Sequence, residues 1–374
     1  MKFDINKLAE ARHPDVTHHI HHWEMALKEK YLEGNRQAYE RYLAADYQWF
    51  GTVGEQYALS DNAGTQRMYQ LSEDFRAGFS DIVLSHHMLG ESNMAGNYCI
   101  VEATHSGTYC GIEATGNRVR FATVAIARFD PEGNLVEERE LWDELGLLRQ
   151  IDFIRDKTST LLVGLISAMD KVADLSLYPS INLPEISRIL YCDQTFEQDN
   201  RDLKVLRNIA SWLKFTEKKY TRQDFETINE VMSSQYQYFG SGNYHADTSI
   251  PAVRQDMLNC FKAEMEEHPD IHFHSHLFGE GDMAVYNVAP EFTHTDNLLG
   301  IPPTHRRLRF VNISIGRFDA QGRIAEETEI HDFIAMYKQL GLIPNDKPLF
   351  RLVDVLRHLE ERIERLEIPA ELSQ

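Results

Sequence analysis

The chain has 374 residues, 43% of them hydrophobic and 26% charged, which is typical of a folded globular protein with more than one domain. Its formal net charge of −20 argues against nucleic acids, whose binding needs clustered Lys and Arg, and against anionic membranes. The four cysteines have no metal-binding or disulfide spacing, the first residues form no apolar signal segment, and no apolar run could span a bilayer. We therefore predict a soluble, cytoplasmic protein.

The elements predicted in the first half are helices followed by strands. Apolar residues at helical spacing indicate a helical region over Trp23–Ala45, and an aromatic segment, Tyr47–Phe50, comes next. A second helical stretch covers Asn62–Ala77. Four strand-like runs separated by glycines complete the half, at Asp81–Glu91, Met94–Tyr109, Arg118–Asp130 and Asn134–Asp143. Helices before a run of strands favour an α+β fold over alternating β-α-β units.

The same pattern occurs twice. The segment RFDPEGNLVEERELWD at Arg128–Asp143 returns as RFDAQGRIAEETEIHD at Arg317–Asp332, an offset of 332 − 143 = 189 residues. The register holds without a gap over Trp23–Gln150. Chance does not preserve one register over so long a stretch, so we infer an internal duplication.

Each half ends in a predicted helical tail. Amphipathic patterns indicate helices over Thr158–Leu175 and Leu349–Leu366, and a proline-containing stretch at Tyr178–Pro184 marks the joint between the halves. We expect two domains, at residues 1–180 and 190–374. The tails could pack on their own domains, on each other, or in an oligomer contact. Neither half has a GxGxxG or P-loop motif, so a nucleotide site is not predicted.

Several motifs resemble those of the SnoaL-like polyketide cyclase family. The second half has the Gly-Ile-Pro-Pro-Thr run at Gly300–Thr304 and an aspartate, Asp332, ahead of Gln339–Gly341, and the first half has matching residues at Gly111–Gly116 and Trp142–Asp143. The resemblance covers most of each half. It implies the nuclear transport factor 2-like fold, in which a curved antiparallel sheet packs on helices to form a cone with a deep apolar pocket. It also implies a catalytic role for Asp143 and Asp332 as general acid or base.

The residues around these aspartates allow two interpretations. Strand alternation puts Asp143 on one face with Leu141, and Asp332 with Ile330. Apolar surroundings would raise the pKa of the carboxyl towards the range suited to removing a proton next to a carbonyl. Alternatively, each aspartate caps the helix that follows it.

His105 and His294 are the second predicted catalytic pair. They occupy matching places in a strand, and an imidazole beside a carboxylate can move a proton or polarise a carbonyl. The alternative is a structural histidine held by hydrogen bonds.

Further paired residues are candidates for substrate binding. The histidines and aromatic residues could line a pocket or belong to the hydrophobic core. The arginines could bind an anionic group of a substrate or lie solvated at the rim of the pocket. The candidates are His87, His276, Trp49, Tyr238, Tyr47, Tyr236, Arg120 and Arg309.

Two histidine clusters raise the question of a metal. The opening helix contains histidines at i, i+3 and i, i+4 spacing, at His18, His19, His21 and His22. On a predicted strand of the second half, alternate residues His272, His274 and His276 would share a face and could act with His294. The first half lacks the last cluster, and the family resemblance implies no metal, so we predict neither metal nor cofactor.

Together these features predict a cofactor-free enzyme for a small hydrophobic or polyketide-like substrate. The reaction would be aldol-type cyclisation, isomerisation, hydration or dehydration by Asp/His acid–base chemistry. The alternative is a non-catalytic tandem module for ligand binding or dimerisation. Leu141 and Ile330 favour it, since the cyclases often have histidine at this place. We expect no nucleic acid or membrane partner, and a homodimer is one option.

Overall fold

The computed structural model describes residues 14–51, 56–58, 62–154, 202–221, 224–242, 244–266, 270–296, 303–341, 351–354 and 356–357. No helix in these ranges is long and apolar enough to cross a membrane. The predicted tail over Thr158–Leu175, most of Leu349–Leu366 and the expected domain limits at 180 and 190 lie outside the described residues.

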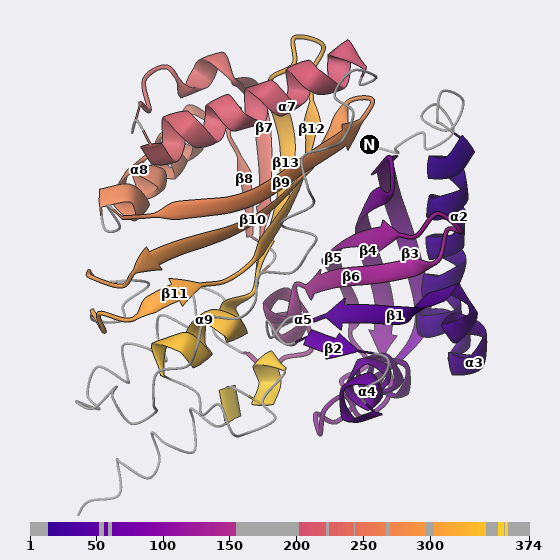
Figure 1. The fold of residues 1–374 in the computed structure, drawn as a ribbon. Coiled ribbons are helices and arrows are strands. Elements are labelled where there is room, and N and C mark those ends of the chain that lie inside the picture. Colours follow the sequence, from indigo (N-terminus) through magenta and orange to yellow (C-terminus); the bar gives the residue numbers. More distant parts are fainter. Residues whose placement is uncertain are drawn as a thin grey trace, which may run out of the picture.

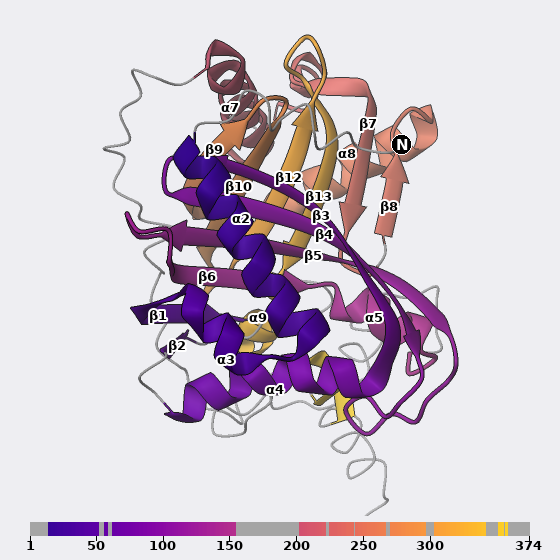
Figure 2. The same cartoon turned by 90° about the vertical axis from the view of Figure 1, so that its right-hand side faces the viewer.

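The first unit is a curved six-stranded sheet with α2 lying across its outer face (Figure 2). The strand order is β2-β1-β6-β5-β4-β3. Neighbouring strands are antiparallel except β1 and β6, which run parallel, so the sheet is mixed where the resemblance implied an antiparallel one. The elements are α2 (Pro14–Lys28), the π-helical turn η1 (Glu29–Glu33), α3 (Arg36–Tyr39), η2 (Glu40–Tyr42), β1 (Leu43–Phe50), β2 (Gln56–Ala58), α4 (Asn62–Gly78), β3 (Phe79–Glu91), β4 (Met94–His105), β5 (Arg118–Phe129), β6 (Leu135–Trp142) and α5 (Glu144–Gln150).

The second unit repeats this plan with a seven-stranded sheet. Its order is β11-β10-β12-β13-β7-β8, with β9 also paired to β10, and β13 runs parallel to β7. The counterpart of β5 is divided into two strands, β11 and β12, which both pair with β10. The elements are α7 (Leu203–Thr216), the π-helical turn η5 (Glu217–Thr221), η6 (Ile228–Glu230), β7 (Met232–Gly240), β8 (Tyr244–Asp247), α8 (Pro251–Glu266), β9 (His272–Glu280), β10 (Met283–Thr293), β11 (Arg307–Arg309), β12 (Asn312–Phe318), β13 (Ile324–His331) and α9 (Phe333–Leu340).

The opening helical region begins earlier, at Pro14, ends earlier, at Tyr42, and is more broken than the sequence indicated. The helix predicted to reach Ala45 gives way to β1 at Leu43, which pairs with Leu135 of β6. Gly34, in the left-handed region at φ 64°, ends η1, and the Asn35 side chain caps α3. Pairing with a distant strand therefore overrides the local helical pattern.

The two sheets pack against each other, with helices α2 and α7 on the outer sides (Figure 1). A buried apolar cluster joins Leu89 and Leu141 of the first unit to Phe278 and Ile330 of the second. Burying one face of each sheet in this way is a major source of stability.

Two reciprocal hydrogen bonds give this contact an internal two-fold relation. Glu91 accepts from the backbone N–H of Gly279, and Glu280 accepts from that of Gly90, each at 2.9 Å. The 189-residue offset relates the two bonds to each other. The units therefore meet as two copies of one surface, which is the arrangement of an isologous dimer.

A short segment near the C-terminus covers part of the first unit. Leu352, Val353 and Leu356 are at most 5% exposed and belong to the apolar cluster that contains Phe75. We call residues 351–357 the C-terminal arm, of which residue 355 lies outside the described residues.

A buried arginine anchors the C-terminal arm. The Arg351 guanidinium donates to the Tyr109 hydroxyl at 3.0 Å and to Asp74 at 2.8 Å. The backbone N–H of Leu352 donates to Glu144 at 2.8 Å. The arm from the second half is thus held by charged and polar groups of the first.

We predict that Arg351→Ala destabilises the protein by about 2–4 kcal/mol, since it leaves a buried hydroxyl and a carboxylate without their donor. Urea unfolding measures this change. Arg323→Ala removes a more exposed i, i+4 pair with Asp319 and should cost less than about 1 kcal/mol. Equal losses in the two variants would contradict anchoring by Arg351.

Candidate active site

Two glutamates on one strand of each sheet face the helical layer. Side chains alternate along β6, so Glu138 and Glu140 bond to residues of the helical layer while Leu141 packs between the two sheets. On β13, Glu327 and Glu329 occupy the same places, with Ile330 between the sheets. On this face of the sheet, each unit therefore places two carboxyl groups that lie two residues apart.

Glu138 accepts three hydrogen bonds inside the first unit. Trp23 Nε1 donates at 2.9 Å, the Tyr47 hydroxyl at 2.7 Å and the Tyr39 hydroxyl at 3.3 Å. Burial, followed by the charge of Glu138, raises the pKa of Tyr47 well above its ordinary value, so the phenol stays neutral. The predicted binding residue Tyr47 is therefore part of a closed network.

Glu140 is neutralised by a buried lysine. Its Oε2 accepts from Lys30 Nζ at 3.1 Å and from the Tyr31 hydroxyl at 2.6 Å, while Trp142 Nε1 donates to Oε1 at 2.9 Å. Burial acts to raise the pKa of Glu140, but Lys30 and these hydrogen bonds outweigh it and leave the pKa below its ordinary value. Lys30 Nζ also lies 5.3 Å from the centre of the Trp49 ring, which places that predicted binding residue here.

Glu327 has a different environment in the second unit. The Tyr236 hydroxyl donates to its Oε2 at 2.5 Å. Burial, and then repulsion from Glu329, raise the pKa of Glu327 to about 7. A carboxyl group with this pKa can donate or accept a proton at neutral pH.

Glu329 lies among donors and positive charge. The Tyr238 hydroxyl donates at 2.9 Å, Asn312 Nδ2 donates at 3.5 Å, and His331 Nε2 lies 3.6 Å away. Burial acts to raise the pKa of Glu329, but His331, Lys219 and the Tyr238 hydrogen bond outweigh it and lower the pKa. The second unit therefore holds one carboxyl that favours its proton beside one that favours its charge.

Two substitutions distinguish the sites. Tyr238 stands where the first unit has Trp49, and His331 stands where it has Trp142. An indole has one N–H donor and does not titrate, whereas a phenol and an imidazole can each exchange a proton.

The second site is also more open to solvent. The side chain of Glu140 is 5% exposed, whereas that of its counterpart Glu329 is 13% exposed. The C-terminal arm belongs to an apolar cluster that contains residues of both units, and the Trp142 ring packs against this cluster.

Sequence reasoning missed the residues at the centre of both sites. The 189-residue offset could have identified them, because it relates Lys30 to Lys219, Glu138 to Glu327 and Glu140 to Glu329. The two lysines also lie in matching π-helical turns, η1 and η5, a local distortion that is frequent at functional sites. In the sequence these glutamates belong to acidic runs, which are typical of solvated surfaces.

The predicted catalytic aspartates lie at the seam between the units. Oδ1 of Asp143 and of Asp332 accepts from the backbone N–H three residues on, at 3.0 and 3.1 Å, so each caps the following helix. Asp143 also accepts from Gly242 N at 2.5 Å. Arg139 of the first unit faces Asp332 across the seam. Burial lowers the pKa of Arg139 to about 10, although the negative charge of Asp332 acts to raise it.

The predicted catalytic histidines make identical contacts in the two units. Nδ1 of His105 lies 3.0 Å from the Thr115 hydroxyl, and Nδ1 of His294 lies 2.9 Å from that of Thr304. The backbone N–H of each threonine donates to the same Nδ1, so the ring nitrogen is an acceptor there. Burial lowers the pKa of His105, which favours the neutral ring. These contacts tie the loop that follows β4 or β10 to its strand.

His87 and His276 lie near the seam. The His87 ring stacks on Tyr98 at 5.7 Å, and burial, followed by Arg317 of the second unit, lowers the pKa of His87. His276 is buried beside Phe278, which belongs to the cluster between the sheets. The structure therefore does not gather these histidines with the glutamate pairs.

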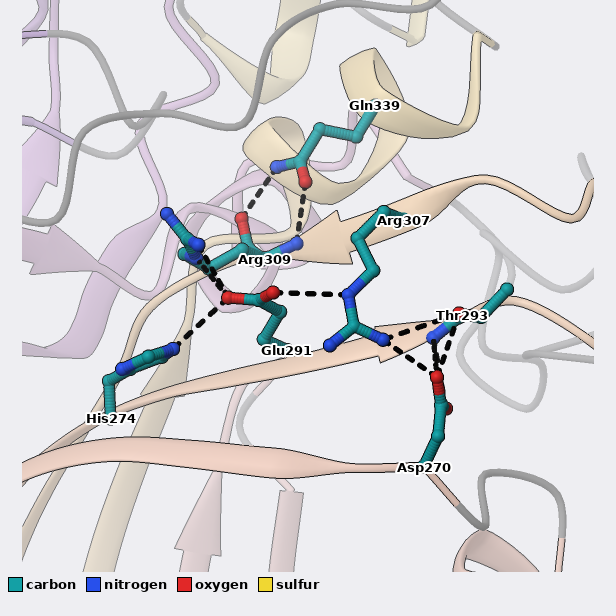
Figure 3. A network of polar contacts seen from close by, with 7 residues as sticks. All are labelled: Asp270, His274, Glu291, Thr293, Arg307, Arg309 and Gln339. Carbon is teal, nitrogen blue, oxygen red and sulfur yellow. Dashed lines mark hydrogen bonds and ion pairs between the residues drawn. The ribbon is translucent and has the colours of Figure 1, made fainter.

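The predicted binding arginines pair with carboxylates of the neighbouring strand. Arg309 Nε donates to Glu291 at 2.7 Å, and His274 Nε2 contacts the same carboxylate at 3.0 Å (Figure 3). In the first unit, Arg120 Nε lies 3.2 Å from Glu102. Each guanidinium group thus forms an ion pair with a glutamate of the same sheet.

The second histidine cluster does not converge on a metal site. His274 contacts Glu291, whereas His272 is exposed. In the ranges that the structure describes, no group of three or more His, Cys, Asp or Glu residues is arranged to hold a metal ion.

Comparisons with known proteins agree with the repeated architecture. A sequence model described as SnoaL-like polyketide cyclase matches residues 21–151 and again residues 210–340. No curated protein matches the chain significantly.

Similar solved structures cover one unit each. A proposed SnoaL-like polyketide cyclase from Jannaschia sp. CCS1 is 16% identical, with a TM-score of 0.34, and covers 39% of this chain and 99% of its own. IdmH, a proposed polyketide cyclase from Streptomyces antibioticus, is 21% identical, with a TM-score of 0.31, over 36% of this chain and 98% of its own. AclR, a proposed hydroxylase from Streptomyces galilaeus, is 18% identical, with a TM-score of 0.32, over 37% and 99%. The two profile matches together span more than half of the residues, and the chain belongs to the SnoaL-like polyketide cyclase family.

Proposed function

We propose that the protein is a general acid–base enzyme for a small carbonyl compound and that the reaction takes place in the second unit. The observation that supports this is the pair Glu327 and Glu329, whose environments push their pKa values in opposite directions. Such a pair supplies a proton donor and a proton acceptor at one pH.

The roles follow from the contacts of each carboxyl group. Glu327, with Tyr236 hydrogen-bonded to it, holds a proton that can stabilise negative charge developing on a carbonyl oxygen. Glu329 accepts a proton from the carbon next to that carbonyl, and His331, 3.6 Å away, stabilises its charge. Aldol-type cyclisation, isomerisation and dehydration all begin with such a transfer, and membership of the family favours a polyketide-like substrate.

We propose a supporting role for the first unit. Lys30 pairs with Glu140, and Glu138 accepts three hydrogen bonds, so both carboxylates already have partners. A group that is ion-paired and sealed from solvent is poorly suited to exchange protons with a substrate.

Asp332 with His294 remains the second catalytic proposal. The buried Arg139 across the seam supports it, because the Arg139 guanidinium and the Asp332 carboxylate attract each other. The non-catalytic alternative, a tandem ligand-binding module, predicts no turnover by either set of residues.

We predict that Glu327→Gln and Glu329→Gln each slow proton exchange at the α-carbon of a ketone by about 100-fold or more, because each removes one acid–base partner. The probe is α-tetralone in deuterated buffer, followed by NMR. The matched controls are Glu138→Gln and Glu140→Gln, which should leave the rate within about twofold if the second unit does the chemistry.

Other outcomes separate the rival proposals. Loss of exchange in Asp332→Asn or His294→Ala, with full activity in both second-unit glutamine variants, would favour the aspartate–histidine pair. Exchange no faster than buffer in the unmodified chain would contradict the enzyme assignment and favour the ligand-binding module.

The raised pKa of Glu327 predicts how stability depends on pH. The unfolded carboxyl ionises near its ordinary value of 4.5, whereas the folded one keeps its proton up to about 7, so rising pH favours the unfolded state across this window. Glu327→Gln removes this penalty and should raise stability at pH 8 by about 1–3 kcal/mol, with little effect at pH 4. Chemical unfolding at both pH values measures the difference. A gain of the same size at both would show that ionisation is not its cause.

A further inference from the structure

Four histidines on α2 lie outside the sites described above, and they divide into different environments. His19 faces the protein: its ring stacks on Phe129 at 4.7 Å, and its Nδ1 bonds to the Ser92 carbonyl at 3.2 Å. His21 is exposed. The remaining two, His18 and His22, lie one helical turn apart.

His18 and His22 lie together against one turn of the first unit. Their ring centres are 4.0 Å apart. His18 Nε2 contacts the carbonyl of Glu132 at 3.4 Å, and His22 Nδ1 contacts that of Gly133 at 3.0 Å. Gly133, at φ 86°, makes room for this approach, since a Cβ there would lie 2.5 Å from His18 Cδ2.

These contacts fix which nitrogen of each ring carries a lone pair. A carbonyl oxygen only accepts, so in the neutral rings the proton is on His18 Nε2 and on His22 Nδ1. His18 Nδ1 and His22 Nε2 are then unprotonated, and neither has a hydrogen-bond partner among the residues that the structure describes. A histidine whose second nitrogen donates to a backbone carbonyl is oriented in the way that metal ligands usually are.

We propose that His18 and His22 form a binding site for a late first-row divalent metal ion, of which Ni²⁺, Cu²⁺ and Zn²⁺ are the candidates. Histidines at i, i+4 on one helix face act as ligands for one ion, and imidazole is a preferred ligand of these metals. Water completes the coordination, so the site is open and the ion exchangeable. The formal charge of −20 favours the approach of a cation.

The site has a structural consequence for the first unit. Both rings bridge α2 to the turn after β5, and α2 lies across the outer face of the sheet (Figure 2). A metal held by both rings restricts their rotation and so secures this contact. Binding to the folded state alone stabilises it in proportion to metal concentration.

The test is titration of the full, untagged chain with Ni²⁺ at pH 7.5, followed by calorimetry. Ni²⁺ is chosen because imidazole is one of its preferred ligands. We expect His18→Gln or His22→Gln to weaken this site at least about tenfold and the double variant to remove it, since each deletes one of two ligands. His21→Gln is the matched control from the same helix and should bind as the unmodified chain does.

A spectroscopic measurement distinguishes binding at His18 and His22 from binding of the metal at other histidines. Cu²⁺ at one equivalent should show two nitrogen ligands by electron paramagnetic resonance, falling to one in either single variant. Unchanged spectra and Ni²⁺ affinity in the double variant would overturn the proposal, as would an equal loss in His21→Gln. Circular dichroism confirms that each variant is folded.

Discussion

Both units are organised around one electrostatic problem, the burial of two carboxyl groups on one face of a single strand beside one lysine. Two negative charges and one positive charge cannot all be satisfied in a medium of low polarity. The protein has two remedies: hydrogen-bond donors from the helical layer, or retention of a proton by one acid. The first unit uses indole and phenol donors around Glu138 and Glu140. Among the described residues of the second unit, the Tyr236 and Ser314 hydroxyls bond to Glu327, and its carboxyl keeps a proton to higher pH.

One fold thus holds a first glutamate pair fully matched by donors and a second pair in which the pKa of one carboxyl is raised. Where the first unit has the indole donor of Trp142, the second unit has the imidazole of His331, 3.6 Å from Glu329. The first unit is also covered by the C-terminal arm, whose Arg351 anchor consists of contacts with Tyr109 and Asp74. In the sequence, the residues that correspond to Tyr109 and Asp74 by the 189-residue offset are Leu298 and Ala263, whose side chains carry no polar group.

Much of the fold followed from local pattern, because glycine-separated strand runs and the 189-residue offset are visible in one sequence. Strand bounds such as Met94–His105 were predicted to within a few residues. The start of β1 at Leu43 was not predicted, because this strand forms by pairing with β6, about ninety residues away in the sequence. The proposed catalytic residues were harder to predict. Glu327 resembles any surface glutamate until the fold surrounds it, and burial is a property of the whole structure.

The reciprocal bonds of Glu91 and Glu280 have a consequence for how the protein changes over generations. In an assembly of two identical chains, every mutation occurs in both subunits, so a change that benefits one site is imposed on the other. Here the symmetric contact lies within one polypeptide. Because the two halves are covalently linked, their pairing does not depend on protein concentration. Each half can therefore be altered alone, and one can specialise in holding the shape while the other acquires new chemistry.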